Sequence, residues 1–400
     1  MTESSTHREG FSRKLELSVV IPCLNEADTL ATCLMKARET MDKHGIDGEL
    51  VVADNGSTDG SQVIAEEKGA RLVAVSRPGY GSALMEGISA ARGKFILMAD
   101  ADESYDLREL FPFVEKLRKG ADLVQGCRLP SGGGRVLPGA MPRLHRWVGN
   151  PLFTLIAQSW FDAPVHDVYC GMRAFSKTAY RSLNLQCTGM EFATEMIVKA
   201  SLSGARIEEV PVTLHPDGRI AHRSHLKTFR DGWRTLRLLL LCSPRWLFLM
   251  PGAVLILLGV LGYGLALPGL TVRGVGFDAH TLLFASLAIL CGYQAVLFAI
   301  LTKTFGIAEG FLRPDRRITL FYQFVTLERG LALAVVSMGV GLGLLGAAVN
   351  QWRLVRFGAL DYAHTMRFVV PGATLTALGL QTALWSFFAS VLGIGRRRNR

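Results

Sequence analysis

The chain has 400 residues, 49% of them hydrophobic, and a formal net charge of +10. Its length exceeds one ordinary domain, and its mean hydropathy of +0.27 is high for a wholly soluble protein. The seven cysteines show no metal-ligand spacing, which argues against a zinc site and favours reduced thiols. The first fifteen residues are polar without a signal-peptide core, so we expect residues 1–15 to form a disordered lead.

Short apolar runs alternate with amphipathic helical patterns in the first half of the chain, and they predict strands and helices in turn. The predicted strands are Leu17–Ile21, Leu50–Ala53, Leu72–Val75, Phe95–Ala99 and Leu123–Gln125. The predicted helices lie near Ala27–Lys43, Ser61–Lys68, Ser82–Ala91 and Leu107–Lys119. This alternation predicts an α/β domain with a Rossmann-like, mostly parallel sheet, which we expect over residues 16–225.

Polar residues directly follow three of the predicted strands. The first strand leads into Asn25 and Glu26, the second into Asp54, and the fourth into Asp100-Ala101-Asp102. Ligands of open α/β sheets bind beyond the carboxyl ends of the strands, and alternate residues of an extended chain point the same way. Asp100 and Asp102 can therefore face one divalent cation that also holds a diphosphate. For this short motif alone, a solvated turn is the ordinary alternative.

Two common nucleotide-binding motifs are absent from the sequence. There is no Gly-x-x-x-x-Gly-Lys-Ser/Thr loop, and no Gly-x-Gly-x-x-Gly follows the first strand. The sequence therefore argues against a P-loop enzyme and against a dinucleotide-dependent dehydrogenase.

Four long apolar runs occupy the second half of the chain, and none of them contains Lys, Arg, Asp or Glu. They are Trp246–Pro268, Leu282–Thr302, Leu331–Asn350 and Phe368–Gly393. Each is near or above the roughly 20 residues that span a bilayer as a helix. We expect an all-α membrane domain of four transmembrane helices over residues 246–395.

Basic residues cluster beside these runs. They are more numerous in the approach to the first run, in the link between the second and third, and in the tail than in the other two links. This bias predicts a multi-pass protein of the cell (inner) membrane with its globular domain and both termini in the cytoplasm, including a basic tail over residues 396–400. The cluster favours lipid headgroups and phosphates over nucleic acid as partners. We expect an interfacial juxtamembrane helix over residues 226–245, and Trp147–Phe161 could also lie in the membrane interface.

The ordered set of motifs resembles the family-2 glycosyltransferases of the GT-A fold, in particular the polyprenyl-phosphate or dolichol-phosphate sugar transferases. The resemblance covers about residues 17–240. It rests on Val19-Val20-Ile21-Pro22 with Asn25-Glu26, Asp54 to Gly60, Asp100-Ala101-Asp102, Gly126-Cys127-Arg128, Asp167 to Arg173 and Glu191 to Glu195. It implies inverting transfer of a hexose from a UDP- or GDP-linked sugar to a polyprenyl phosphate, with Mg²⁺ or Mn²⁺ as the cofactor.

The resemblance also implies roles for individual residues. The nucleotide-sugar pocket would contain Pro22, Asn25, Glu26, Asp54, Asp100, Arg219 and Lys227, and the metal ligands would be Asp100 and Asp102. The acceptor phosphate would be met by Arg128, Arg146, Asn150 and Arg173, and the catalytic residues would be Asp102, Arg128 and Glu195. The loop His215–Lys227 is longer than the Gly-x-Ser-Lys pattern of the family, which leaves open which basic residue contacts the donor.

Two other functions are weighed against this one. A processive polysaccharide synthase of the same family should carry Gln-x-x-Arg-Trp, whereas this chain has Cys242-Ser-Pro-Arg245-Trp246. A non-catalytic membrane protein that only binds a nucleotide would keep its function after Asp102→Asn. Association into a homo-oligomer is left open by the sequence.

Overall fold

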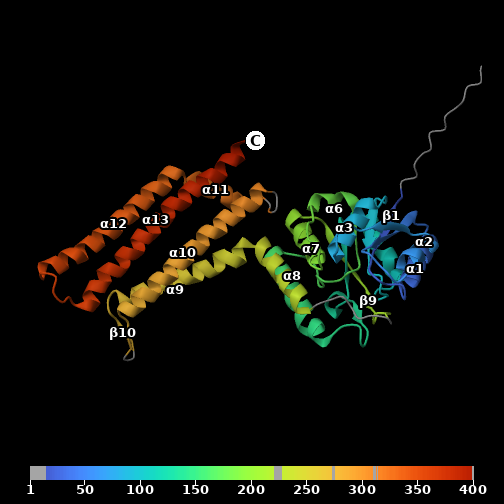
Figure 1. Ribbon diagram of the computed structural model, residues 1–400, viewed down its shortest axis with the longest axis horizontal. Helices are drawn as coiled ribbons and strands as arrows, with labels where there is room; N and C mark the ends of the chain where they lie inside the picture. Colours follow the sequence, from blue (N-terminus) through green and yellow to red (C-terminus); the bar gives the residue numbers. More distant parts are fainter. Residues whose placement is uncertain (1–14, 220–227, 273–274, 310–311, 313, 399–400) are drawn as a thin grey trace, which may run out of the picture. The chain divides into compact units, whose positions relative to one another are not determined.

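The computed structural model describes residues 15–398 except 220–227, 273–274, 310–311 and 313 (Figure 1). It contains two compact units, Met1–Leu239 and Leu240–Arg400. The disordered lead expected over residues 1–15 falls almost wholly outside the described residues, and so does the end of the basic tail.

The first unit is built on a seven-stranded sheet with the order β3-β2-β1-β4-β7-β5-β8. Within this sheet β7 runs antiparallel to β4 and β5, and the other neighbouring strands are parallel. The strands are β1 (Leu17–Cys23), β2 (Gly48–Asp54), β3 (Arg71–Ala74), β4 (Phe95–Met98), β5 (Leu123–Cys127), β7 (Arg173–Ser176) and β8 (Ile207–Pro211). The sheet confirms the predicted Rossmann-like, mostly parallel architecture.

Helices cover both faces of the sheet (Figure 1) and form two cores with it. Along β1, Val19 and Ile21 belong to one core and Val20 to the other, as the two-residue period of a strand requires. The first core includes α1 (Leu30–Lys43) and α4 (Phe111–Arg118), and the second includes α3 (Tyr80–Ala90), α5 (Asn150–Phe161) and α7 (Phe192–Ser203). The unit also contains α2 (Ser61–Glu67), α6 (Lys177–Leu183), most of α8 (Thr228–Cys242) and the paired short strands β6 (Arg135–Val136) and β9 (Thr213–Leu214).

All five predicted strands and all four predicted helices are present, with their ends shifted by a few residues. The last of these helices begins as a 3₁₀ turn at Leu107–Leu110 and continues as α4. Strands β7 and β8 lie beyond the last predicted strand, so the sequence did not predict their places in the sheet.

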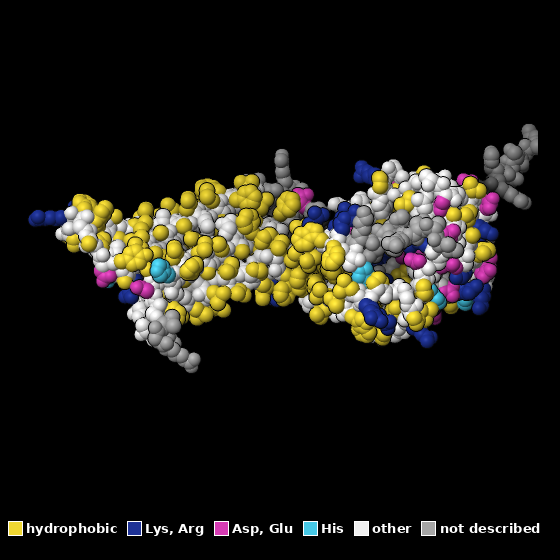
Figure 2. Space-filling model, turned by 60° about the horizontal axis from the view of Figure 1, so that its bottom comes forward, with side chains coloured by type: hydrophobic (Ala, Val, Ile, Leu, Met, Phe, Trp, Pro, Cys, Tyr) yellow, Lys and Arg dark blue, Asp and Glu magenta, His cyan; other side chains and the backbone are white. Residues whose placement is uncertain are grey.

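The second unit consists mainly of helices. In the part of the chain that the structure describes, four helical segments are long and apolar enough to cross a membrane: Arg245–Ala266, Ala279–Ala308, Leu327–Leu354 and Tyr362–Leu392. These segments confirm the predicted four-helix membrane domain, and Figure 2 shows hydrophobic side chains spread over the surface of this unit. The elements are α9 (Met250–Ala266), α10 (Ala279–Ala308), α11 (Arg316–Phe324), α12 (Leu327–Leu354), α13 (Tyr362–Arg398) and a small hairpin of β10 (Thr271–Val272) and β11 (Val275–Gly276). The sequence did not predict α11.

Glycines bring the membrane helices together in two pairs. A Cβ on Gly252 of α9 would lie 2.8 Å from the carbonyl oxygen of Gly292 of α10, and one on Gly341 of α12 would lie 2.7 Å from that of Gly372 of α13. Such close backbone approach is the usual packing of small residues between helices in membranes. Hydroxyl groups join α10 and α13, where Tyr293 and Thr382 are hydrogen-bonded at 2.7 Å.

Candidate active site

The loop after β2 is shaped by Asp54, the last residue of that strand. Its buried carboxylate accepts hydrogen bonds from the backbone N–H groups of Gly56 and Ser57, both at 3.1 Å, and from Nε2 of Gln62 at 2.7 Å. Asp54 therefore fixes the backbone of the turn that follows it.

The loop after β1 is tied to the same segment. Asn25 adopts a left-handed conformation with φ of 58°. Its N–H donates to Ser57 Oγ at 2.9 Å, and its Oδ1 accepts the N–H of Thr58 at 2.8 Å. Pro22 lies near the end of β1, in register with the end of β2. The structure thus brings Pro22, Asn25 and Asp54 to one edge of the sheet.

Asp100 and Asp102 follow β4 at the same edge. The hydroxyl of Tyr80 donates to Asp100 Oδ1 at 2.9 Å. Gly171 lies so close that a Cβ there would be 2.5 Å from Asp100 Oδ2. Burial, together with the nearby charge of Asp102, raises the pKa of Asp100 to about 6.

Asp102 lies against Arg219, which follows β9. The Nη1 atom of Arg219 is 3.1 Å from Asp102 Oδ2. Nε and Nη2 of the same guanidinium donate to the Glu26 carboxylate at 2.6 to 3.1 Å. Burial lowers the pKa of Arg219, but the hydrogen bonds to Glu26 and the charge of Asp102 outweigh burial and raise it. The structure therefore joins Glu26, Asp102 and Arg219 in one ionic cluster.

The two aspartates fit a cation that arrives with a diphosphate. No group of three or more His, Cys, Asp or Glu side chains among the described residues could enclose a metal ion. Mg²⁺ is usually held by one or two carboxylates together with substrate phosphates and water, so two carboxylates suffice. Burial is the main cause of the raised pKa of Asp100 and repulsion by Asp102 adds to it; a divalent cation between the two carboxylates would relieve that repulsion.

Arg128 forms a buried ion pair at the end of β5. Its Nε and Nη2 atoms donate to the two carboxylate oxygens of Asp167 at 2.7 and 2.9 Å, and its backbone N–H donates to Asp167 at 3.0 Å. Burial lowers the pKa of Arg128, but the charge and hydrogen bonds of Asp167, together with Tyr105 and Cys170, outweigh burial and raise it, which keeps the guanidinium charged. Asp167 therefore fixes the orientation of this cation.

Arg146 and Asn150 lie where a π-helical turn, His145–Gly149, runs into α5. The guanidinium of Arg146 lies 5.4 Å from the ring centroid of Trp147. Asn150 is buried, and its Nδ2 contacts Met141 Sδ at 3.3 Å. The pKa of His145 is lowered by burial and by the charge of Arg128, which indicates that this turn lies near Arg128.

Arg173, predicted to meet the acceptor phosphate, lies in the core. The side chain is 0% exposed. Its guanidinium donates to the backbone carbonyls of Ala193 and Cys170, both at 2.6 Å, and of Val168 at 3.5 Å. Because both terminal nitrogens donate to the backbone, these contacts favour a structural role for Arg173 over contact with the acceptor phosphate.

Glu195, predicted to be catalytic, has its carboxylate bonded to neighbouring groups of the protein. Its carboxylate accepts the backbone N–H groups of Gln186 and Cys187 at 3.0 and 2.8 Å and pairs with Lys199 at 2.8 Å. It is buried in the first turn of α7. These contacts indicate that Glu195 holds the preceding loop, and they do not support a catalytic role. Lys227, predicted to contact the donor, lies outside the described residues.

Several residues at the site received no role from the sequence, among them Asp167, Gly171 and Tyr80. Asp167 and Gly171 belong to a motif that was recognised, but their contacts with Arg128 and Asp100 join residues far apart in the chain. Tyr80 opens α3 and carries no sequence signal for its hydrogen bond to Asp100.

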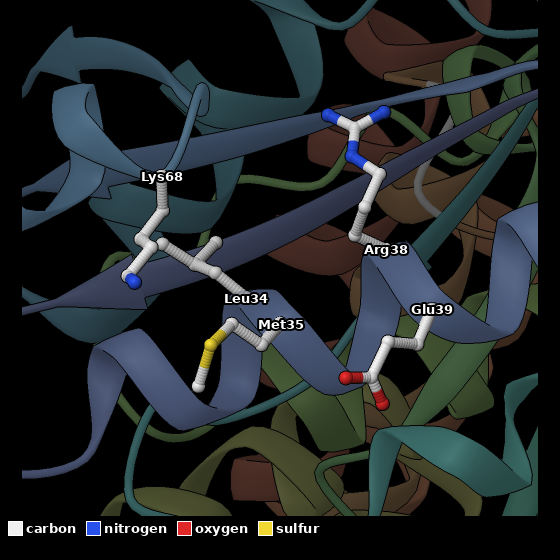
Figure 3. A pocket seen from close by; sticks show the side chains of 5 residues that line it. All are labelled: Leu34, Met35, Arg38, Glu39 and Lys68. Carbon is white, nitrogen blue, oxygen red and sulfur yellow. The ribbon is translucent and has the colours of Figure 1, made fainter.

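A shallow pocket elsewhere on this unit contains none of the predicted site residues. It has a volume of about 150 Å³ and lies on α1 beside the end of α2 (Figure 3). It is lined by Leu34, Met35, Arg38, Glu39 and Lys68. Its lining has no strand-end carboxylate, so it does not compete with the strand-end loops as the candidate site.

The fold and the site together define a membrane-bound glycosyltransferase of GT-A architecture. Residues 18–183 match the family model described as "Glycosyl transferase family 2", and residues 300–393 match the "Glycosyltransferase family 2 C-terminal transmembrane region". The low-salt glycan biosynthesis hexosyltransferase Agl6 of Haloferax volcanii is 38% identical over 94% of this chain and 89% of that protein. The chain belongs to glycosyltransferase family 2.

Two further likenesses cover the first unit. The dolichyl-phosphate hexose transferase of Haloferax volcanii is 30% identical over 49% of this chain and 82% of that protein. The crystal structure of glucosyl-3-phosphoglycerate synthase from Mycobacterium tuberculosis with Mn²⁺, UDP and glucosyl-3-phosphoglycerate has a TM-score of 0.44 and 22% identity. That likeness covers 59% of this chain and 85% of the synthase.

Proposed function

We propose that this glycosyltransferase moves a hexose from a UDP- or GDP-linked sugar to a polyprenyl phosphate, with inversion at the anomeric carbon. The product is a polyprenyl-phosphate sugar. The observation that carries the proposal is the pair Asp100 and Asp102 at the end of β4, with Arg219 in contact with Asp102. The printed names of the two Haloferax relatives, a hexosyltransferase and a dolichyl-phosphate hexose transferase, support the sugar and acceptor classes.

The donor needs stabilisation of its leaving diphosphate. Mg²⁺ or Mn²⁺ held by Asp100 and Asp102 would neutralise this negative charge. Tyr80 holds Asp100 in place and Ser104 holds Asp102, so both carboxylates are oriented in advance. Arg219 adds a positive charge beside them. Pro22, Asn25 and Asp54 form the neighbouring edge, where we place the nucleoside.

The acceptor phosphate is itself an anionic nucleophile, so no strong general base is needed. Arg128, held in place by Asp167, is the first candidate to position it. Arg146 lies on a nearby turn and is the second candidate. Direct in-line attack on the sugar would then invert the anomeric configuration.

The lipid acceptor must reach the site from a bilayer, and one surface of the first unit suits contact with it. Hydrophobic side chains stand exposed on α5, on the turn before it and on α8, among them Trp147, Leu155, Phe229 and Trp233. The two segments adjoin, because His145 is hydrogen-bonded to Thr228 at 3.0 Å. Exposed apolar patches with aromatic residues are typical of membrane-interface surfaces. We place this surface at the cytoplasmic face of the cell membrane, following the basic residues beside the spans.

Membranes containing the protein, incubated with labelled nucleotide sugars and polyprenyl phosphate, should yield label that is soluble in chloroform. Asp102→Asn should abolish the transfer. The matched control Asp106→Asn, whose side chain caps the following 3₁₀ turn, should retain it. No transfer from any donor would overturn the proposal, and a product with the anomeric configuration of the donor would overturn the inverting mechanism. Label in a growing polymer would instead identify a processive synthase.

A further inference from the structure

The two carboxylate oxygens of Asp102 have different partners. Oδ1 accepts the backbone N–H of Ser104 at 3.1 Å and its hydroxyl at 2.5 Å. Oδ2 lies 3.1 Å from Nη1 of Arg219. The oxygen left for a metal ion by the local turn is therefore the oxygen that the guanidinium contacts.

Arg219 is held in this position from several sides. Its side chain is 10% exposed, and those of Glu26 and Asp102 are 5% and 14% exposed. Glu26 accepts one edge of the guanidinium, because Nε and Nη2 donate to its two carboxylate oxygens at 2.9 and 2.6 Å. Asp217 lies 3.7 Å from Nη1. The guanidinium is thus a largely shielded cation with three acidic neighbours.

The backbone before Arg219 is attached to the same turn. Gly218 N–H donates to the carbonyl oxygen of Asp102 at 2.9 Å, and His215 N–H donates to that of Ser104 at 2.9 Å. These bonds fix the segment from His215 to Gly218 against the Asp102–Ser104 turn. The contact between Arg219 and Asp102 is therefore built into the fold.

We propose that Arg219 is a displaceable counter-cation of Asp102, and that Glu26 is the positioning residue that retains it when a divalent cation takes its place. The inference rests on the proposed function, because it takes Asp102 as a metal ligand. A guanidinium and a divalent cation repel each other at such short range, so both cannot use Oδ2. The cation must push Nη1 away, whereas Nε and Nη2 keep their bonds to Glu26. The freed Nη1–H can then donate to a phosphate oxygen that accompanies the cation.

This arrangement couples the binding of the metal to that of the nucleotide. A cation that arrives alone must break the contact between Arg219 and Asp102 without replacement. A cation that arrives with a nucleoside diphosphate offers the guanidinium a new anionic partner. The metal and the nucleotide should therefore strengthen each other's binding, and by thermodynamic linkage the factor is the same in both directions.

The test measures binding of Mn²⁺ to the full chain in detergent from the electron paramagnetic resonance signal of free Mn²⁺, with and without UDP or GDP. The principal variant is the double substitution Glu26→Gln with Arg219→Met. It removes one negative and one positive charge, so the net charge equals that of the wild type and no unpaired carboxylate remains at position 26. Without nucleotide, we expect this variant to bind Mn²⁺ about tenfold more tightly than the wild type. With nucleotide, the advantage should disappear.

Arg219→Lys is the second variant, because lysine keeps the charge but lacks the fork that contacts Glu26 and Asp102 together. Without nucleotide, it should also bind Mn²⁺ more tightly than the wild type, but by a smaller factor than the double variant. Thermal unfolding checks that each variant is folded. Equal Mn²⁺ affinity of both variants and the wild type without nucleotide would overturn this inference but leave the proposed metal site standing. Absence of Mn²⁺ binding to the wild type, even with UDP or GDP, would overturn the metal site itself.

Discussion

Arg146 and Arg173 have different surroundings in the first unit, and substitutions at the two positions should have different effects. Arg173 is 0% exposed and donates to backbone carbonyls, whereas Arg146 is partly exposed beside Trp147. We therefore predict that Arg173→Met lowers stability, whereas Arg146→Met raises the KM for the polyprenyl phosphate.

The expected loss for Arg173→Met follows from its contacts. Two hydrogen bonds, to Ala193 and Cys170, are 2.6 Å long, and the one to Val168 is 3.5 Å long. A hydrogen bond to a charged group contributes about 1.5–3 kcal/mol. Part of this loss in the free energy of unfolding is offset, because the substitution also removes the cost of burying a charged group. We expect a net loss of about 2–4 kcal/mol in the free energy of unfolding, which lowers the melting temperature of the first unit by about 4–16 °C.

Thermal unfolding in detergent, followed by circular dichroism, measures the loss of stability in Arg173→Met. Titration of the acceptor at saturating donor measures the KM of Arg146→Met for the polyprenyl phosphate. Arg146→Met serves as the matched control, because its free energy of unfolding should change by no more than about 0.5 kcal/mol. Its KM for the acceptor should rise by about tenfold, the cost of one charged contact with a phosphate. An unchanged melting temperature together with a raised acceptor KM for Arg173→Met would refute this reasoning.

Two further predictions concern Glu195 and the membrane helices. Glu195→Gln should keep turnover within about tenfold of the wild type, because the Glu195 carboxylate binds the backbone N–H of Cys187 and the Lys199 side chain. A loss of turnover of a thousandfold or more would instead indicate that Glu195 is catalytic. Gly341→Leu should lower the melting temperature of the membrane unit, because a Cβ there meets the Gly372 carbonyl at 2.7 Å. Gly343→Leu, where nothing lies within 4 Å of the added Cβ, is its control, and equal effects of the two substitutions would contradict the packing.

The edge of the sheet that carries the site was predictable because it depends on local patterns. Apolar runs of strand length end at Asn25, Asp54 and Asp100, and parallel strands bring such ends together. The ionic cluster of Glu26 and Arg219 was not predictable in the same way. Its members are 193 positions apart, and no periodicity links a loop after β1 to one after β9. The spans were predictable from their length and lack of charge, whereas α11 is too short to give a comparable signal.

The motif from Asp167 to Arg173 shows why recognising a segment does not assign its residues. β7 begins at Arg173 and runs antiparallel between β4 and β5, with Arg173 in register with Met98 and Gln125. An antiparallel strand starts at the edge where its parallel neighbours end. The residues just before β7 therefore lie at the site, where Asp167 meets Arg128 and Gly171 meets Asp100. Arg173 has already entered the sheet, and its guanidinium donates to backbone carbonyls of the core. The direction of β7, which the hydrophobic pattern does not encode, thus divides one motif between the active site and the core.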